Sequence, residues 1–112
     1  MEITVESRPA EGGRTVVEVS GEVDVYSAPA LDTHLTDLID GGQVRLVIDL
    51  RQVDFLDSTG LGVLVKALKR TREQQGSLDI VAGDDRIVKV FRITGLDAVI
   101  PIHATPDAAL AR

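Results

Sequence analysis

The chain begins with alternating apolar and polar positions and continues with short aliphatic runs. Ile3 and Val5 alternate with polar neighbours, Glu2 among them, which is typical of a half-buried strand. The run from Val44 to Leu50 is almost continuously aliphatic, as in a strand that helices cover on both faces of a sheet. Strands are therefore predicted around residues 3–5 and over 15–20, 44–50, 78–82 and 98–102, the last at a sheet edge because Pro101 interrupts it.

Apolar residues spaced three and four apart predict amphipathic helices between these runs. Ser27 is a good N-cap for the first helix, and Asp84 or Asp85 for the third. Glycines follow the helical patterns and are typical of helix ends. Helices are predicted from Ser27 to Asp40, from Leu61 to Arg72 with Gly76 as the stop, from Asp84 or Asp85 to Gly95, and through Ala108 to Ala111.

The order of these elements predicts the fold class. The second half of the chain alternates strand and helix, which implies two right-handed crossovers and parallel strands. The turn over residues 9–14, with Gly12 and Gly13, predicts an antiparallel hairpin before them. We therefore expect one α/β domain over residues 1–112, with a mixed sheet of about four to five strands and about four helices.

Composition excludes several classes of function. The net charge is −6 and aromatic residues make up 3% of the 112 residues, which argues against a nucleic-acid partner that needs cations and stacking rings. Cysteine is absent, so disulfides and thiolate chemistry are absent too. The acidic start resembles no signal peptide and no apolar run could span a membrane, so a cytoplasmic location is expected.

The most distinctive stretch runs from Asp54 to Gly62, with the sequence D-F-L-D-S-T-G-L-G. It joins a predicted strand to a predicted helix and places two hydroxyls, Ser58 and Thr59, at the helix start. Ser58 could cap the helix, accept a phosphate, or do both. A helix N-terminus favours negative charge, so a phosphate there would change the surface without unfolding the domain.

Enzyme chemistry finds little support in the residues. His34 and His103 are far apart in the sequence, neither begins a metal-binding spacing, and both fit surface or hydrogen-bonded structural roles. The context of Ser58 is not the G-x-S-x-G elbow of a hydrolase. We therefore expect no catalytic residue and no metal ligand.

Two further interpretations, a nucleotide-binding loop and a magnesium site, lack residues that such sites require. Gly60 and Gly62 lack the third glycine of a dinucleotide loop and the Gly-Lys-Ser/Thr of a mononucleotide loop. We expect them instead to permit close approach of a neighbouring strand or of a partner protein. Asp24, Asp54 and Asp57 could suggest a magnesium site like that of a phosphoacceptor aspartate protein. Such a protein has paired acids at the end of its first strand and a lysine at the end of a later strand, and both are missing here.

Three blocks resemble a known family. The chain is similar to the STAS domains, and within them to the single-domain anti-sigma factor antagonists of bacteria. The similarity covers nearly the whole chain, and the D-S-T-G-L-G segment with the upstream G-E-V-D is its most specific part. The matching blocks are Gly21–Pro29, then Val47–Leu50 with Val53–Gly62, and finally Val88–Leu96.

The resemblance implies partner switching. An unphosphorylated antagonist binds an anti-sigma factor that is also a serine kinase and so frees a sigma factor; phosphorylation releases the antagonist, and a serine phosphatase resets it. By position Ser58 is the phosphoacceptor and Thr59 a secondary candidate. Asp24 is the acidic neighbour needed for kinase recognition, so that Asp24→Asn would impair phosphorylation or docking.

The resemblance also implies what the chain itself lacks. ATP and magnesium would belong to the kinase, so no cofactor is expected here. The alternative implied function is a STAS subunit of a stress-sensing or membrane transport assembly, and the weakest is a nucleotide-binding domain. Tyr26 and Ser27 carry no role beyond surface contact. The expected partner-binding residues are Asp24, Tyr26, Ser27, Asp57, Ser58, Thr59 and Gly60.

Overall fold

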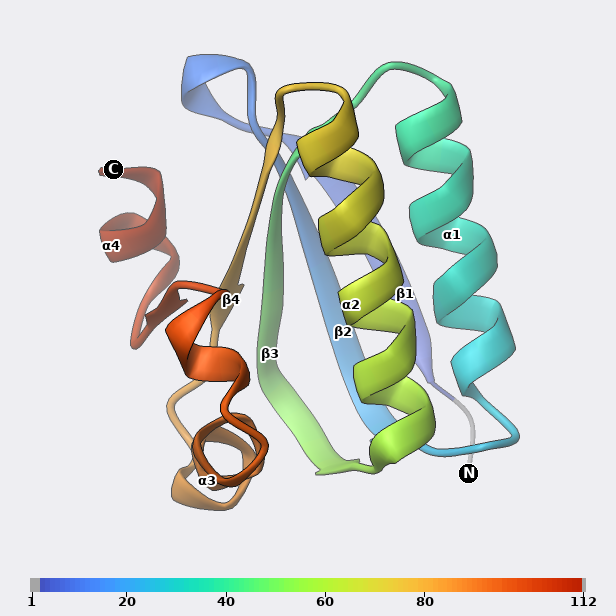
Figure 1. Cartoon of the computed structure of the whole chain (residues 1–112), viewed down its shortest axis with the longest axis vertical. Helices are drawn as coiled ribbons and strands as arrows, with labels where there is room; N and C mark the ends of the chain where they lie inside the picture. The colour runs from blue at the N-terminus through green and yellow to red at the C-terminus, as the bar shows by residue number, and fades with distance from the viewer. Residues whose placement is uncertain (1–2, 112) are drawn as a thin grey trace.

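Five strands form one sheet in which the spatial order follows the sequence order (Figure 1). The first pair is antiparallel, and every other neighbouring pair is parallel. The predicted mixed sheet is therefore confirmed, and the connection between the second and third strands is a further parallel crossover. The strands are β1 (Thr4–Pro9), β2 (Thr15–Val23), β3 (Arg45–Leu56), β4 (Ser77–Val81) and β5 (Ile102–His103).

The computed structural model describes residues 3–111, so Glu2 and the two ends of the expected domain lie outside the described residues. Four α-helices connect or follow the strands, as predicted. They are α1 (Ala28–Asp40), α2 (Ser58–Glu73), α3 (Asp85–Ile93) and α4 (Pro106–Leu110), with short 3-10 turns at Glu11–Gly13 and Leu96–Ala98. Within residues 3–111, no helix has the length and apolar character needed to cross a membrane.

Helices α1 and α2 lie side by side against one face of the sheet (Figure 1). Two ion pairs join them, Lys66 to Asp32 at 3.0 Å and Arg70 to Asp40. The main apolar core fills the space between the sheet, these two helices and α3. The core is aliphatic apart from Phe91, as the low aromatic content requires.

A smaller cluster covers the opposite face of the sheet. Val16, Val47 and Val81 come from the three central strands and pack with Ala109 of α4. The aliphatic start of β3 is thus buried on both faces, which confirms that prediction. Cover on the α4 side is limited, because this helix has only five residues.

The prediction that β3 ends near Leu50 is wrong. The strand continues to Leu56 because β2 is also longer than predicted and pairs with it up to Val23. The register shifts at two points, one of them after Gly21, whose φ of +101° is a conformation that favours glycine. The candidate stretch therefore begins inside the sheet and leaves it only at Asp57.

Two other predicted boundaries also differ. The last strand is the two-residue β5 at the edge, because residues 96–98 form a 3-10 turn instead of extended chain. Helix α2 ends at Glu73, and Gln75, not Gly76, takes the positive φ that reverses the chain. Gly76 is required for a different reason: a Cβ there would overlap the backbone carbonyl of Val44.

Candidate functional site

Ser58 is the first residue of α2, and its side chain is exposed. The N-cap is Asp57, whose Oδ1 accepts hydrogen bonds from the backbone amides of Thr59 at 2.9 Å and Gly60 at 3.3 Å. Within residues 3–111 the Ser58 hydroxyl makes no hydrogen bond. The hypothesis that Ser58 caps the helix is therefore wrong, because the preceding carboxylate already satisfies the free amides.

Gly60 lets the start of α2 pack tightly against the sheet. A Cβ at this position would lie 2.6 Å from Leu56 Cδ1 and 2.6 Å from Val23 Cγ1, closer than carbon atoms can approach. The expected close approach is thus made by neighbouring side chains of the two strands. Gly62 differs, because it is exposed and no described atom would lie within 4 Å of an added Cβ.

The end of β2 connects this helix start to a second turn. The backbone amide of Asp57 donates to the carbonyl of Val23 at 3.1 Å, and Val23 is fully buried beneath Gly60. The chain then enters the turn over residues 24–27, which leads into α1. The two predicted halves of the site, around Asp24 and around Ser58, therefore lie at the same end of the sheet.

Asp24 organises its own turn. Its Oδ1 accepts hydrogen bonds from the backbone amides of Tyr26 at 2.9 Å and Ser27 at 3.0 Å. These hydrogen bonds, that from Ser27 first, lower the pKa of Asp24 below its usual value because they stabilise the charged carboxylate. The acidic neighbour expected near Ser58 is thus turned toward its own backbone.

Ser27 is not the side-chain cap that the sequence predicts. It is only 7% exposed, and its hydroxyl donates to the carbonyl of Glu22 at 2.7 Å and accepts from the amide of Asp24 at 2.9 Å. A serine at a predicted helix start can serve the preceding chain equally well, and here it locks the turn. Ser27 therefore fixes the turn over residues 24–27 from its buried side.

Three large apolar side chains are exposed at this end of the sheet. Tyr26 is 89% exposed, Val25 is 56% exposed, and Phe55 near the end of β3 is 47% exposed. We call the exposed group formed by Val25, Tyr26, Phe55, Ser58 and Thr59 the turn surface. It combines apolar contact area with the three hydroxyl groups of Tyr26, Ser58 and Thr59, a mixed composition that is common at protein docking sites.

The alternative chemistries receive no geometric support. Within the described part of the chain, no three histidine or acidic side chains converge on a possible metal site. Asp24 and Asp57 each direct a carboxylate oxygen at backbone amides of their own turn. His103 pairs with Asp79 across β4 and β5 at 2.8 Å, whereas His34 Nε2 is buried without a hydrogen-bond partner among residues 3–111.

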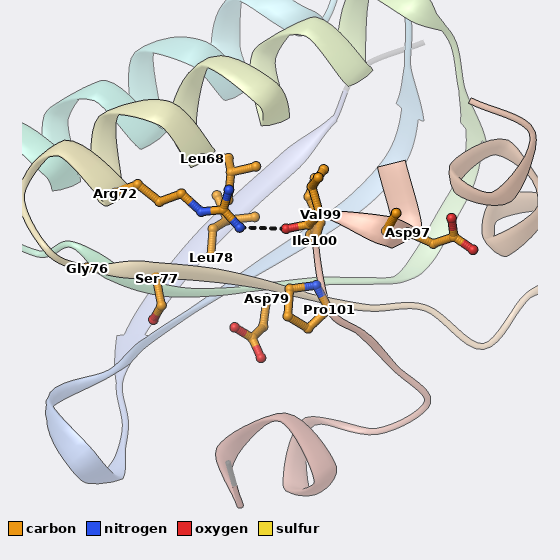
Figure 2. Close-up of a pocket in the computed structure, with 11 residues that line it drawn as sticks. Leu68, Arg72, Gly76, Ser77, Leu78, Asp79, Asp97, Val99, Ile100 and Pro101 are labelled. Atoms are coloured by element: carbon orange, nitrogen blue, oxygen red, sulfur yellow. Dashed lines mark hydrogen bonds between the residues drawn. The ribbon is translucent and has the colours of Figure 1, made fainter. Parts of the chain in front are cut away.

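A hollow of about 410 Å³ lies near the far end of α2 (Figure 2). Arg72 reaches toward the opposite wall and donates to the carbonyl of Val99 at 2.7 Å, while Asp79 and Asp97 supply carboxylates to the lining. The rise of an α-helix places Arg72 about 21 Å along α2 from Ser58. The hollow is therefore separate from the turn surface.

Two features of the site were not predicted from the sequence. Asp57 is the N-cap of α2, and Val23 connects the turn at Asp24 to the start of α2. Aspartate and serine are equally good N-caps, so two adjacent candidates cannot be separated by type alone. The role of Val23 depends on the pairing of β2 with β3 beyond the register shift, which no local pattern encodes.

Comparison with known proteins agrees with the fold. A family model for the STAS domain matches residues 3–109. The chain is 42% identical to an anti-sigma-B factor antagonist of Bacillus subtilis, over 84% of this chain and 85% of that protein. It is 37% identical to an anti-sigma-B factor antagonist of Listeria monocytogenes, over 91% and 90%.

Solved structures also resemble the chain. A crystal structure of an anti-sigma factor antagonist from Mycobacterium paratuberculosis superposes with a TM-score of 0.90 at 35% identity, covering 97% of this chain and 92% of that one. The similarity therefore extends over nearly the whole fold.

Proposed function

The chain belongs to the STAS domain family, and from this premise we propose that it is an anti-sigma factor antagonist switched by phosphorylation of Ser58. Relatives that are 37–42% identical to this chain over most of their own length are named anti-sigma-B factor antagonists. The chain acts by binding and not by catalysis. Its partner is an anti-sigma factor, which it binds when unphosphorylated.

One observation carries the proposal of a switch at Ser58. The hydroxyl is exposed at the N-terminus of α2 and has no part in capping the helix, because Asp57 does that. A phosphate can therefore be added without breaking a native hydrogen bond. It adds about −1.5 to −2 charge and three acceptor oxygens, and the helix terminus favours that charge.

The expected partner-binding residues divide into three groups by exposure, and Asp24 and Asp57 form the half-buried group. Tyr26, Ser58 and Thr59 are exposed and can contact a partner directly. Ser27 and Gly60 are buried and hold the turns in place. A phosphate beside the exposed apolar side chains repels an acidic group of the partner, and like-charge contacts cost several kcal/mol. It also disfavours docking into an apolar pocket, because the phosphate would lose its hydration there.

The full cycle needs two further proteins. We propose that the anti-sigma factor is itself the serine kinase and supplies ATP and magnesium from its own site. A serine phosphatase removes the phosphate and restores binding. We propose that these steps take place in the cytoplasm, where a basic docking patch on the partner would complement the net charge of −6.

The proposal is tested by incubating the protein with a candidate kinase and ATP and measuring intact and peptide masses. We expect one phosphate, located on Ser58, and none on Ser58→Ala. Thr59→Ala is the matched control, because it removes the adjacent exposed hydroxyl and should leave phosphorylation intact. Phosphate on Ser58→Ala at the wild-type rate would refute the assignment.

Binding supplies the second half of the test. Ser58→Ala should bind the anti-sigma factor like the wild-type protein, because the hydroxyl makes no hydrogen bond within residues 3–111. A wild-type protein that binds no anti-sigma factor and accepts no phosphate would overturn the proposed function itself.

A further inference from the structure

We propose that Asp24 is a positioning residue, whose carboxylate holds the turn over residues 24–27 so that Tyr26 projects as the aromatic anchor for the anti-sigma factor. This inference rests on the proposed function. It assigns Asp24 a role other than direct recognition by the kinase, and it assigns Tyr26 a leading role in affinity, beyond the surface contact that the sequence indicates.

Five hydrogen bonds that involve a backbone group close the turn. Asp24 Oδ1 accepts from the amides of Tyr26 and Ser27, at 2.9 and 3.0 Å. The Ser27 hydroxyl accepts from the amide of Asp24 and donates to the carbonyl of Glu22. The amide of Ala28 donates to the carbonyl of Asp24 at 2.8 Å, which starts α1. Every one of these bonds fixes backbone, so the turn has a defined shape before any partner arrives.

The side chains between Asp24 and Ser27 are the ones left in solvent. Tyr26 is the most exposed large apolar residue in the described chain at 89%, and Val25 beside it is 56% exposed. Tyrosine is enriched among residues that dominate binding energy, since it buries a large rigid ring with few rotatable bonds. A turn fixed in advance lowers the entropy lost when that ring docks.

The turn is also fixed relative to Ser58. Val23, the residue before Asp24, accepts a hydrogen bond from the amide of Asp57 and packs beneath Gly60. The anchor and the phosphoacceptor are therefore two points on one rigid frame. A partner that binds Tyr26 therefore meets the Ser58 hydroxyl in a constant position. For the same reason, a phosphate on Ser58 can disturb the contact that the partner makes with Tyr26.

The competing explanation is that the kinase recognises the negative charge of Asp24 directly. The two explanations differ for Asp24→Asn. An asparagine keeps an oxygen that can accept the two amide hydrogen bonds but removes the charge. Asp24→Ala removes both the oxygen and the charge. If the carboxylate positions the turn, Asp24→Asn keeps the binding and phosphorylation that Asp24→Ala loses. If the charge is recognised, both variants lose binding and phosphorylation to the same extent.

The first measurement needs no partner. Tyr26 is the single tyrosine and the chain has no tryptophan, so intrinsic fluorescence reports this side chain alone. We expect the time-resolved fluorescence anisotropy of Asp24→Asn to match the wild-type protein. Asp24→Ala should show an added fast decay because its turn is no longer fixed. An unchanged decay in Asp24→Ala, with an intact thermal midpoint, would overturn the positioning role.

The second measurement uses the anti-sigma factor. Tyr26→Ala should weaken binding at least thirtyfold, Tyr26→Phe less than threefold, and Asp24→Ala about tenfold, with Asp24→Asn within threefold of wild type. In phosphorylation assays Asp24→Ala should raise KM with little change in kcat, because it loses docking and not chemistry.

Equal losses in Asp24→Asn and Asp24→Ala, or wild-type affinity in Tyr26→Ala, would overturn the inference while leaving the switch at Ser58 intact. Failure of the wild-type protein itself to bind or to be phosphorylated would instead count against the proposed function. The two failures are therefore distinguishable in one set of experiments.

Discussion

Replacing Asp57 and Ser58 separately tests whether the helix cap and the phosphoacceptor are independent. Asp57→Ala removes the oxygen that accepts from the amides of Thr59 and Gly60, and both amides then lie at a helix start without an intramolecular partner. Loss of an N-cap of this kind costs about 0.5–2 kcal/mol of unfolding free energy. Ser58→Ala removes an exposed hydroxyl that makes no hydrogen bond within residues 3–111, so its effect should stay within about 0.5 kcal/mol.

Ser58→Asp places a carboxylate where a phosphate would stand. The helix terminus favours this charge by about 0.3–1 kcal/mol, and Coulomb repulsion from the nearby Asp57 carboxylate opposes it. We therefore expect a thermal midpoint close to that of the wild-type protein. For a domain of this size 1 kcal/mol corresponds to roughly 4–5 °C, so Asp57→Ala should melt about 2–9 °C lower and remain distinguishable.

Thermal and urea unfolding, followed by far-ultraviolet circular dichroism, measure these differences. Asp57→Asn is the matched control, because asparagine is as good an N-cap as aspartate and should recover most of the loss. A Ser58→Ala or Ser58→Asp variant that loses as much stability as Asp57→Ala would show that Ser58 is a structural residue. The separation of cap and switch would then be refuted.

Two further predictions concern glycines and acid. Gly60→Ala should destabilise the fold by about 1–3 kcal/mol, because a Cβ there overlaps the neighbouring side chains. Gly62→Ala should raise the unfolding free energy by about 0.4–1 kcal/mol, because its Cβ meets no such neighbour and alanine reduces the entropy of the unfolded chain. Chemical denaturation measures both changes, and equal effects of the two substitutions would contradict this prediction. Backbone amides hold the pKa of Asp24 below its ordinary value of 3.8, and the arginine two residues on does the same for Asp84. Both carboxylates therefore contribute stability that is present above about pH 3.8 and is lost as the pH falls through their lower folded pKa values. Acid unfolding of a double Asp24→Asn, Asp84→Asn variant should be less steep than that of the wild-type protein, and an identical pH profile would refute the assignment.

Much of the architecture could be predicted from periodicity and turn chemistry. The aliphatic run at Val44–Leu50 and the helical spacing after it dictate a buried strand and a crossover helix. The extension of β3 to Leu56 could not be predicted, because four of the six residues after Leu50 are exposed, only half of the six are apolar, and pairing with β2 holds them. Tertiary pairing decided this boundary, not local propensity.

The position of Ser58 at a helix start could be predicted, but the hydrogen bonds of the acidic side chains around it could not. Ser58 stands where the sequence places it, at a helix start, yet the neighbouring carboxylate takes the amides that a serine could have taken. Asp24 was expected to present charge near Ser58, yet its oxygen is bound to its own backbone. Short polar side chains can bond to several nearby backbone groups, and only the folded turn selects among these choices.

The central claim is that a phosphate on Ser58 changes binding without changing the fold. It is tested most directly by phosphorylating the protein, separating the two forms, and measuring for each the affinity for the anti-sigma factor and the thermal midpoint. We expect the phosphorylated form to bind at least a hundredfold more weakly, which corresponds to about 2.8 kcal/mol, with a midpoint within about 2 °C of the unmodified form. Equal affinities, or a loss of binding that coincides with unfolding, would contradict the account.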